Sequence, residues 1–88
     1  MGLNEDFSKL ADRLKTERDE LKLKMHLASM EVKEEFEEAE EKWGHVKLKA
    51  SDIADEAVET SDEYIAKAKI IGEELKETYR RIAKRLSE

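Results

Sequence analysis

Carboxylates are the most abundant side chains in this sequence that could do chemistry. Thirteen acidic residues fall between positions 31 and 63, where only four residues are basic. Seven of these acids form one run: Glu31, Glu34, Glu35, Glu37, Glu38, Glu40 and Glu41. Clustered carboxylates can bind Ca²⁺ or Mg²⁺, but no calcium-loop spacing is present. Because acids on a helix point into water, we interpret the run as a solvated face that a basic protein partner could contact.

The two histidines lack the spacing of a metal site. Di-iron helical bundles use Glu-x-x-His on two helices, whereas Leu23 precedes His26 by three residues and Lys42 precedes His45 by three. Glu41 and His45 lie four residues apart and could share a metal, but the signature fails at both histidines. We therefore predict no metal ligand and no cofactor.

No catalytic motif is present either. The sequence has no cysteine, no glycine-rich phosphate loop, and neither GxSxG nor HExxH, so we predict a protein that is not an enzyme and has no catalytic residue. The missing cysteine fits a reducing compartment, and no stretch resembles a signal peptide or a membrane span. The net charge of −6 argues against general binding to nucleic acid or anionic membranes. These features favour a cytoplasmic protein.

The elements that must position these side chains are long helices. The chain of 88 residues has 45% charged residues, no proline and three glycines, a profile typical of coiled coils. Its apolar residues recur mostly every three or four positions, as a packed helical face requires. We predict a single all-α domain over 1–88: a helix over about 5–46, a turn within 44–52 where Gly44, Ser51 and Asp52 lower helix propensity or cap a new helix, and a helix over about 52–86.

This antiparallel hairpin has a simple register. The larger apolar residues pair about position 48, so that each pair sums to 96: Leu10 with Leu86, Leu14 with Ile82, Leu21 with Leu75, Met25 with Ile71, Val32 with Tyr64, and Trp43 with Ile53. With Phe36 and Tyr79, these residues form the predicted core of the hairpin. In this register Tyr79 faces Glu17 and Arg18, which interrupt the stripe, so a hydrogen bond there is expected to fix the register.

Two other arrangements remain open. Thr60 and Glu63 match a capping box, which would move the break to about 59–61. A single uninterrupted helix that pairs antiparallel with a second copy would satisfy the same mirror register, because swapping exchanges identical contacts.

A second apolar face predicts that the hairpin dimerises into a four-helix bundle. Its members lie at least about 100° from the main stripe and form the candidate dimer seam: Leu23, Leu27, Met30, Ala66 and Ile70. In a hairpin the acidic residues 31–63 would become the tip, and the basic C-terminal turns would lie at the open end. Two rods packed antiparallel would then place each acidic tip beside a basic end.

The segment Glu17–Ala28, the acidic stretch that follows as far as Trp43, and the turn Tyr79-Arg80-Arg81-Ile82 together resemble a group of small bacterial coiled-coil proteins without a characterised function. The resemblance implies a helical fold and a bacterial cytoplasmic setting. It implies no active-site residue.

The sequence therefore predicts a homo-oligomeric interaction or scaffold protein that is not an enzyme. A peripheral protein that binds a membrane or envelope surface through an amphipathic face is the alternative, although the charge makes the membrane a less expected partner than a second copy.

Overall fold

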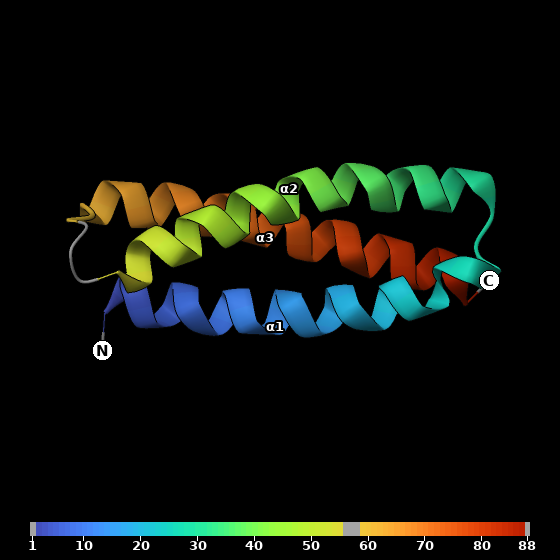
Figure 1. Cartoon of the computed structure of the whole chain (residues 1–88), viewed down its shortest axis with the longest axis horizontal. Helices are drawn as coiled ribbons and strands as arrows, with labels where there is room; N and C mark the ends of the chain where they lie inside the picture. The colour runs from blue at the N-terminus through green and yellow to red at the C-terminus, as the bar shows by residue number, and fades with distance from the viewer. Residues whose placement is uncertain (1, 56–58, 88) are drawn as a thin grey trace.

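The computed structural model describes residues 2–55 and 59–87, and these ranges are helical with no strand. They form a rod of 42 × 19 × 18 Å made of three α-helices: α1 (Leu3–Lys24), α2 (Met30–Ala54) and α3 (Asp62–Leu86) (Figure 1). A 3₁₀ turn, η1 (Met25–Leu27), follows α1. The all-α class is confirmed, but the predicted two-helix hairpin and the single long helix are both wrong, because the chain breaks twice.

The first break divides the predicted helix over 5–46. After η1, Ala28 and Ser29 adopt extended backbone conformations, and the Ser29 hydroxyl accepts a hydrogen bond from the Val32 amide at 3.3 Å. Serine is among the preferred N-cap residues, because its side-chain oxygen pairs with an amide that the first turn leaves free. The sequence signal for this break is therefore Ser29, which the regular apolar stripe on either side conceals.

The predicted turn within 44–52 is also wrong, since α2 runs through this segment without a break. Glycine costs a helix only about 1 kcal/mol relative to alanine. Helix α2 recovers this cost by burying Ala39 and Val46 on either side of Gly44. The later break is the correct alternative: α2 ends at Ala54, and the Ser61 hydroxyl caps α3 by accepting from the Tyr64 amide at 3.1 Å. Residues 56–58 lie outside the described ranges.

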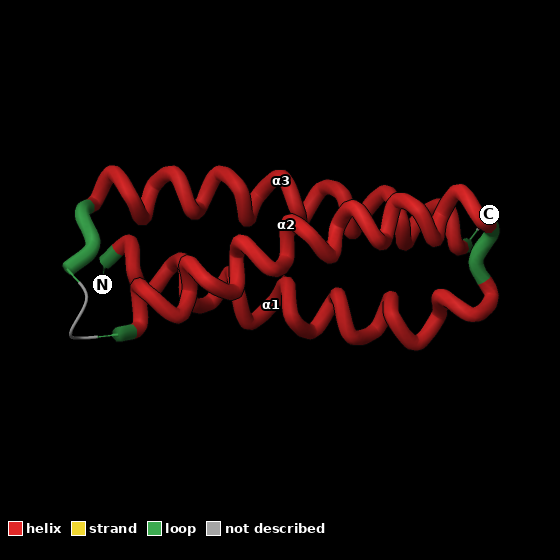
Figure 2. Tube along the Cα trace, turned by 45° about the horizontal axis from the view of Figure 1, so that its top comes forward, coloured by secondary structure: helices red, strands yellow, loops and turns green. Residues whose placement is uncertain are grey.

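The three helices run up, down and up, so α1 and α3 are parallel and α2 is antiparallel to both (Figures 1 and 2). The mirror register fails for this reason. Leu10 lies against Gly72, where a Cβ atom would stand 2.8 Å from Leu10 Cδ2, and not against Leu86. Trp43 and Ile53, another mirror pair, both belong to α2. Gly72 thus leaves room for the Leu10 side chain between α1 and α3.

The core lies between three helices and not between two. Of the fourteen residues assigned to the hairpin core, eight are buried: Leu10, Leu14, Leu21, Val32, Phe36, Leu75, Tyr79 and Ile82. Six are half-buried: Met25, Trp43, Ile53, Tyr64, Ile71 and Leu86. The bundle also buries Phe7, Ala11, Ala39, Val46, Ile65 and Ala68. An apolar stripe thus identifies which residues turn inward, but it does not identify the helix they face.

Candidate functional site

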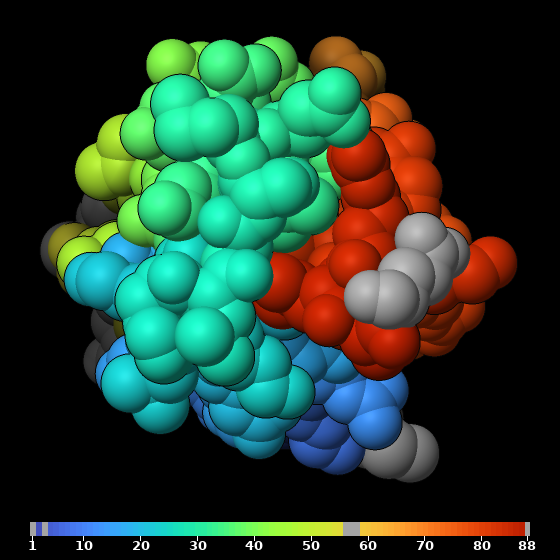
Figure 3. Space-filling model, turned by 90° about the vertical axis from the view of Figure 1, so that its right-hand side faces the viewer, coloured from blue at the N-terminus to red at the C-terminus, as the bar shows by residue number. Residues whose placement is uncertain are grey.

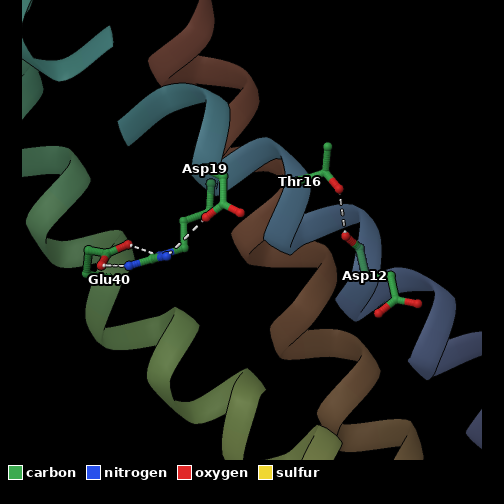
Figure 4. Close-up of polar contacts among 5 residues, drawn as sticks. Asp12, Thr16, Asp19 and Glu40 are labelled. Atoms are coloured by element: carbon green, nitrogen blue, oxygen red, sulfur yellow. Dashed lines mark hydrogen bonds and ion pairs between the residues drawn. The ribbon is translucent and has the colours of Figure 1, made fainter. Parts of the chain in front are cut away.

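A polar contact joins two helices in the half of the bundle nearest the connection between α1 and α2, where Arg18 interrupts the apolar stripe of α1. Arg18 Nε donates to Glu40 Oε1 at 2.6 Å and Nη2 donates to Oε2 at 2.7 Å, a two-pronged pair between α1 and α2 (Figure 4). The hydrogen bond to Glu40 raises the pKa of Arg18. The guanidinium carbon also lies 6.0 Å from the centre of the Trp43 ring, at the limit of a cation–π contact. This contact joins α1 to α2 at a defined register.

Tyr79 of α3 packs beside this contact. Its side chain is buried, and its hydroxyl has no hydrogen-bond partner among the described residues. The predicted hydrogen bond from Tyr79 to Glu17 or Arg18 is therefore wrong, because Arg18 donates instead to Glu40 of α2. Burial raises the pKa of Tyr79, and the charge of Glu40 contributes further. A buried hydroxyl without a hydrogen-bond partner in this position lowers the stability of the fold.

The acidic run on α2 lies beside the basic C-terminal turns of α3. Arg85 donates to Glu31 at 3.0 Å and also pairs with Glu35. The antiparallel packing of α2 and α3 brings these two segments together, so the acidic run on α2 lies along the rod and does not form the tip of a hairpin. Lys67–Glu63 and Arg80–Glu77 are further pairs, on the exposed surface of α3. Isolated exposed pairs of this kind contribute about 0–1 kcal/mol.

Metal-binding geometry is absent from the part of the chain that the structure describes. No group of three or more histidine, cysteine or acidic residues there could hold an ion. His26 is exposed, with its Nδ1 atom 2.7 Å from the carbonyl oxygen of Leu23, and His45 is also exposed on α2. Neither histidine belongs to such a group of three or more ligands among the described residues.

The predicted dimer seam divides into two separate sites. Its large members remain in water, with exposed fractions of 76% for Leu23, 77% for Leu27, 73% for Met30 and 59% for Ile70. Leu23, Leu27 and Met30 cluster at the connection between α1 and α2, and we call these three residues the apolar tip. Ile70 and Ala66 lie on the first half of α3, which begins at the other end of the rod (Figure 1).

Ala66 and Ile70 line a shallow hollow of about 550 Å³ on the outer face of α3. The aliphatic parts of Lys69, Glu73, Glu74 and Glu77 complete its walls, and we call this surface the α3 face. One helix supplies all six residues, so the hollow is too open to enclose a substrate. A groove of this shape suits a second helix.

Leu48 is the remaining exposed large apolar residue among those described, with 67% of its surface in water. It stands on α2 and lines neither the hollow on α3 nor the connection between α1 and α2, and single apolar residues of this kind are normal on protein surfaces. Leu48 therefore serves as a matched control in the experiments below.

Comparisons with known proteins add no assignment. No family model, no curated protein and no solved structure matches this chain. The resemblance to small bacterial coiled-coil proteins stays a prediction. Within residues 2–55 and 59–87, no helix combines the length and the apolar content that a bilayer crossing requires.

Proposed function

We propose that this chain is a cytoplasmic helical interaction protein without enzymatic activity, and that it associates with a second copy through the α3 face. The observation that carries this proposal is Ile70, a large apolar side chain that is mostly exposed beside Ala66 in a hollow built by one helix. A second α3 helix supplies the complementary shape. The dimer seam predicted from the sequence is thereby reduced to two of its five members.

Charge favours an antiparallel arrangement of the two α3 helices. A two-fold axis near Gly72 places Glu63 of one copy opposite Arg81 of the other, and Lys67 opposite Glu77, so each pair occurs twice. Because these residues are exposed, the pairs set orientation more than affinity. The same axis brings the two Ile70 side chains to within about one helical turn. The small apolar content predicts a weak dimer that depends on protein concentration.

Charge reversal tests this arrangement. Positions 63 and 81 lie about 27 Å apart along one α3 helix, so they do not interact within a chain. Glu63→Arg and Arg81→Glu each place like charges opposite one another and should shift the equilibrium toward monomer, whereas the double variant should restore the dimer. Sedimentation equilibrium at up to about 0.1 mM protein measures this, with Leu48→Ser as a control that leaves association unchanged.

Ile70→Ser supplies the apolar half of the test and should also yield monomer. Circular dichroism confirms in each case that the helices are retained. A wild-type chain that remains monomeric throughout this concentration range contradicts the proposal. So does a dimer that the double charge reversal fails to rescue.

A further inference from the structure

We propose that the apolar tip docks on an anionic lipid bilayer, with the basic end of the rod facing the headgroups. This surface is independent of the α3 face. Leu23, Leu27 and Met30 lie within eight consecutive residues, and each has about three quarters of its surface in water. Figure 3 views the rod from this end, where the connection between α1 and α2 faces the viewer beside the C-terminal turns of α3.

The apolar tip has a backbone that suits insertion at the headgroup level. It consists of the last turn of α1, the 3₁₀ turn η1 and the first residue of α2. Part of the backbone here is already paired, since the Met25 amide donates to the Lys22 carbonyl, the Ala28 amide to the Met25 carbonyl and the Lys33 amide to the Ser29 carbonyl. Backbone groups that are paired within the segment lower the cost of leaving water. The tip is too short to cross a bilayer, so this is contact at the surface.

The charge around the tip is opposite to that of the chain as a whole. We count the seven residues of each helix nearest this end, which are 18–24, 30–36 and 80–86. They hold eight basic and five acidic residues, a balance of +3, while the rest of the chain carries −9. Lys22 and Lys24 flank Leu23 directly, and Lys84 lies on the adjacent turns of α3; all three are exposed. Basic residues beside an apolar insertion are the usual combination for anionic membrane surfaces.

The net charge of −6 does not oppose this orientation. Electrostatic interactions decay over about 8 Å at physiological ionic strength, whereas the rod is 42 Å long. A bilayer in contact with one end therefore experiences mainly the local balance of +3. The sequence-level argument against anionic membranes applies to the average over the molecule and not to this end.

A bilayer fits the apolar tip better than a protein groove does. The three exposed side chains come from two helix ends and the connection between them, so they stand at one end of the rod and not along one helix. A fluid interface accepts such a projection without a matching shape, and the lysines supply the attraction. A protein partner would need a hollow of complementary form. The α3 face is acidic, since Glu73, Glu74 and Glu77 line it together with a single lysine, so its charge would suit a basic end, but its apolar part is already assigned to the α3 dimer.

Vesicle flotation tests the proposal with the full chain. We expect the protein to float with vesicles of phosphatidylcholine and phosphatidylserine at about 0.1 M salt, and to remain unbound with phosphatidylcholine alone or at about 1 M salt. Leu23→Ser with Leu27→Ser should lower the partition coefficient at least tenfold. Lys22→Gln with Lys24→Gln should lower it by about twentyfold. Leu48→Ser, a matched exposed leucine, should have no effect.

Three results would overturn the proposal: no flotation, equal flotation on neutral and anionic vesicles, or flotation that the tip variants do not change. A fourth is a loss of self-association in the leucine variant without a change in flotation, which would make the tip a contact between copies. All substitutions are at exposed positions, and circular dichroism verifies the helices. Failure here leaves the α3 dimer untouched, because Ile70 and the 63–81 charge pair report on that dimer separately.

Discussion

At the scale of single residues, the buried hydroxyl of Tyr79 is the clearest imperfection of the core. A buried polar atom without a hydrogen-bond partner lowers the free energy of unfolding by about 1–3 kcal/mol. The Tyr79 hydroxyl is in this position because Arg18 Nε and Nη2 both donate to Glu40. Tyr79→Phe keeps the ring and removes the unpaired oxygen. We therefore expect the free energy of unfolding at neutral pH to rise by about 1 kcal/mol, measured by urea denaturation. A fall of similar size would mean that a bound water pairs the hydroxyl.

The same residue predicts a loss of stability at alkaline pH. The pKa of Tyr79 is raised above the ordinary value of 10.0 mainly by burial, so above about pH 10 the unfolded chain releases this proton while the folded chain keeps it. Because the unfolded state then binds fewer protons, stability falls as pH rises further. Tyr79→Phe should flatten this decline. Tyr64→Phe is the comparison, because burial and the hydrogen bond to Asp52 also raise the pKa of Tyr64, but to a smaller extent. Its effect should therefore be smaller, and an equal effect of both variants would contradict the assignment to Tyr79.

At the scale of helices, two glycines distinguish the observed bundle from the predicted hairpin. Both are helical, but a Cβ atom at Gly44 would meet nothing within 4 Å, whereas one at Gly72 would stand 2.8 Å from Leu10 Cδ2. Gly44→Ala should therefore stabilise the fold by about 0.5–1 kcal/mol. Gly72→Ala should stabilise it less than Gly44→Ala does, because the end of the Leu10 side chain must shift to admit the Cβ atom. Thermal unfolding measures both, and destabilisation by Gly44→Ala would indicate a turn at that position.

The helices also show which parts of the fold can be predicted from the sequence. Period 3.6 in the apolar residues predicts helices, and it finds most of the buried positions, such as Leu14, Leu75 and Ile82. It does not show whether a helix packs against one partner helix or two, because the apolar stripes of the two arrangements look alike on a helical wheel. The breaks depend on local caps at Ser29 and Ser61. Such single-residue signals compete with equally good ones at Ser51 and Thr60, and only the tertiary packing decides among them.

The apolar tip and the α3 face could likewise be predicted only in part from the sequence. Exposed apolar residues off the main stripe were identifiable from the sequence, since Leu27 and Ile70 lie at positions that a two-helix stripe leaves out. Their separation into two sites depends on the first break, which places Leu27 at a connection between helices instead of at mid-helix. The basic environment of the tip depends on α1 and α3 ending together, a consequence of three helices that no local pattern contains.

At the scale of the whole molecule, the two proposals together predict vesicle clustering. An antiparallel pair of α3 helices points the two apolar tips in opposite directions, so a dimer presents one lipid-binding end at each extremity. We expect wild-type protein to raise the turbidity of phosphatidylserine-containing vesicles, because each dimer bridges two bilayers. Glu63→Arg should abolish the clustering while leaving flotation intact, since a monomer has one tip, and Glu63→Arg with Arg81→Glu should restore it. Leu23→Ser with Leu27→Ser should abolish both. Clustering that persists in the monomeric variant would show that the bridge does not come from the α3 dimer.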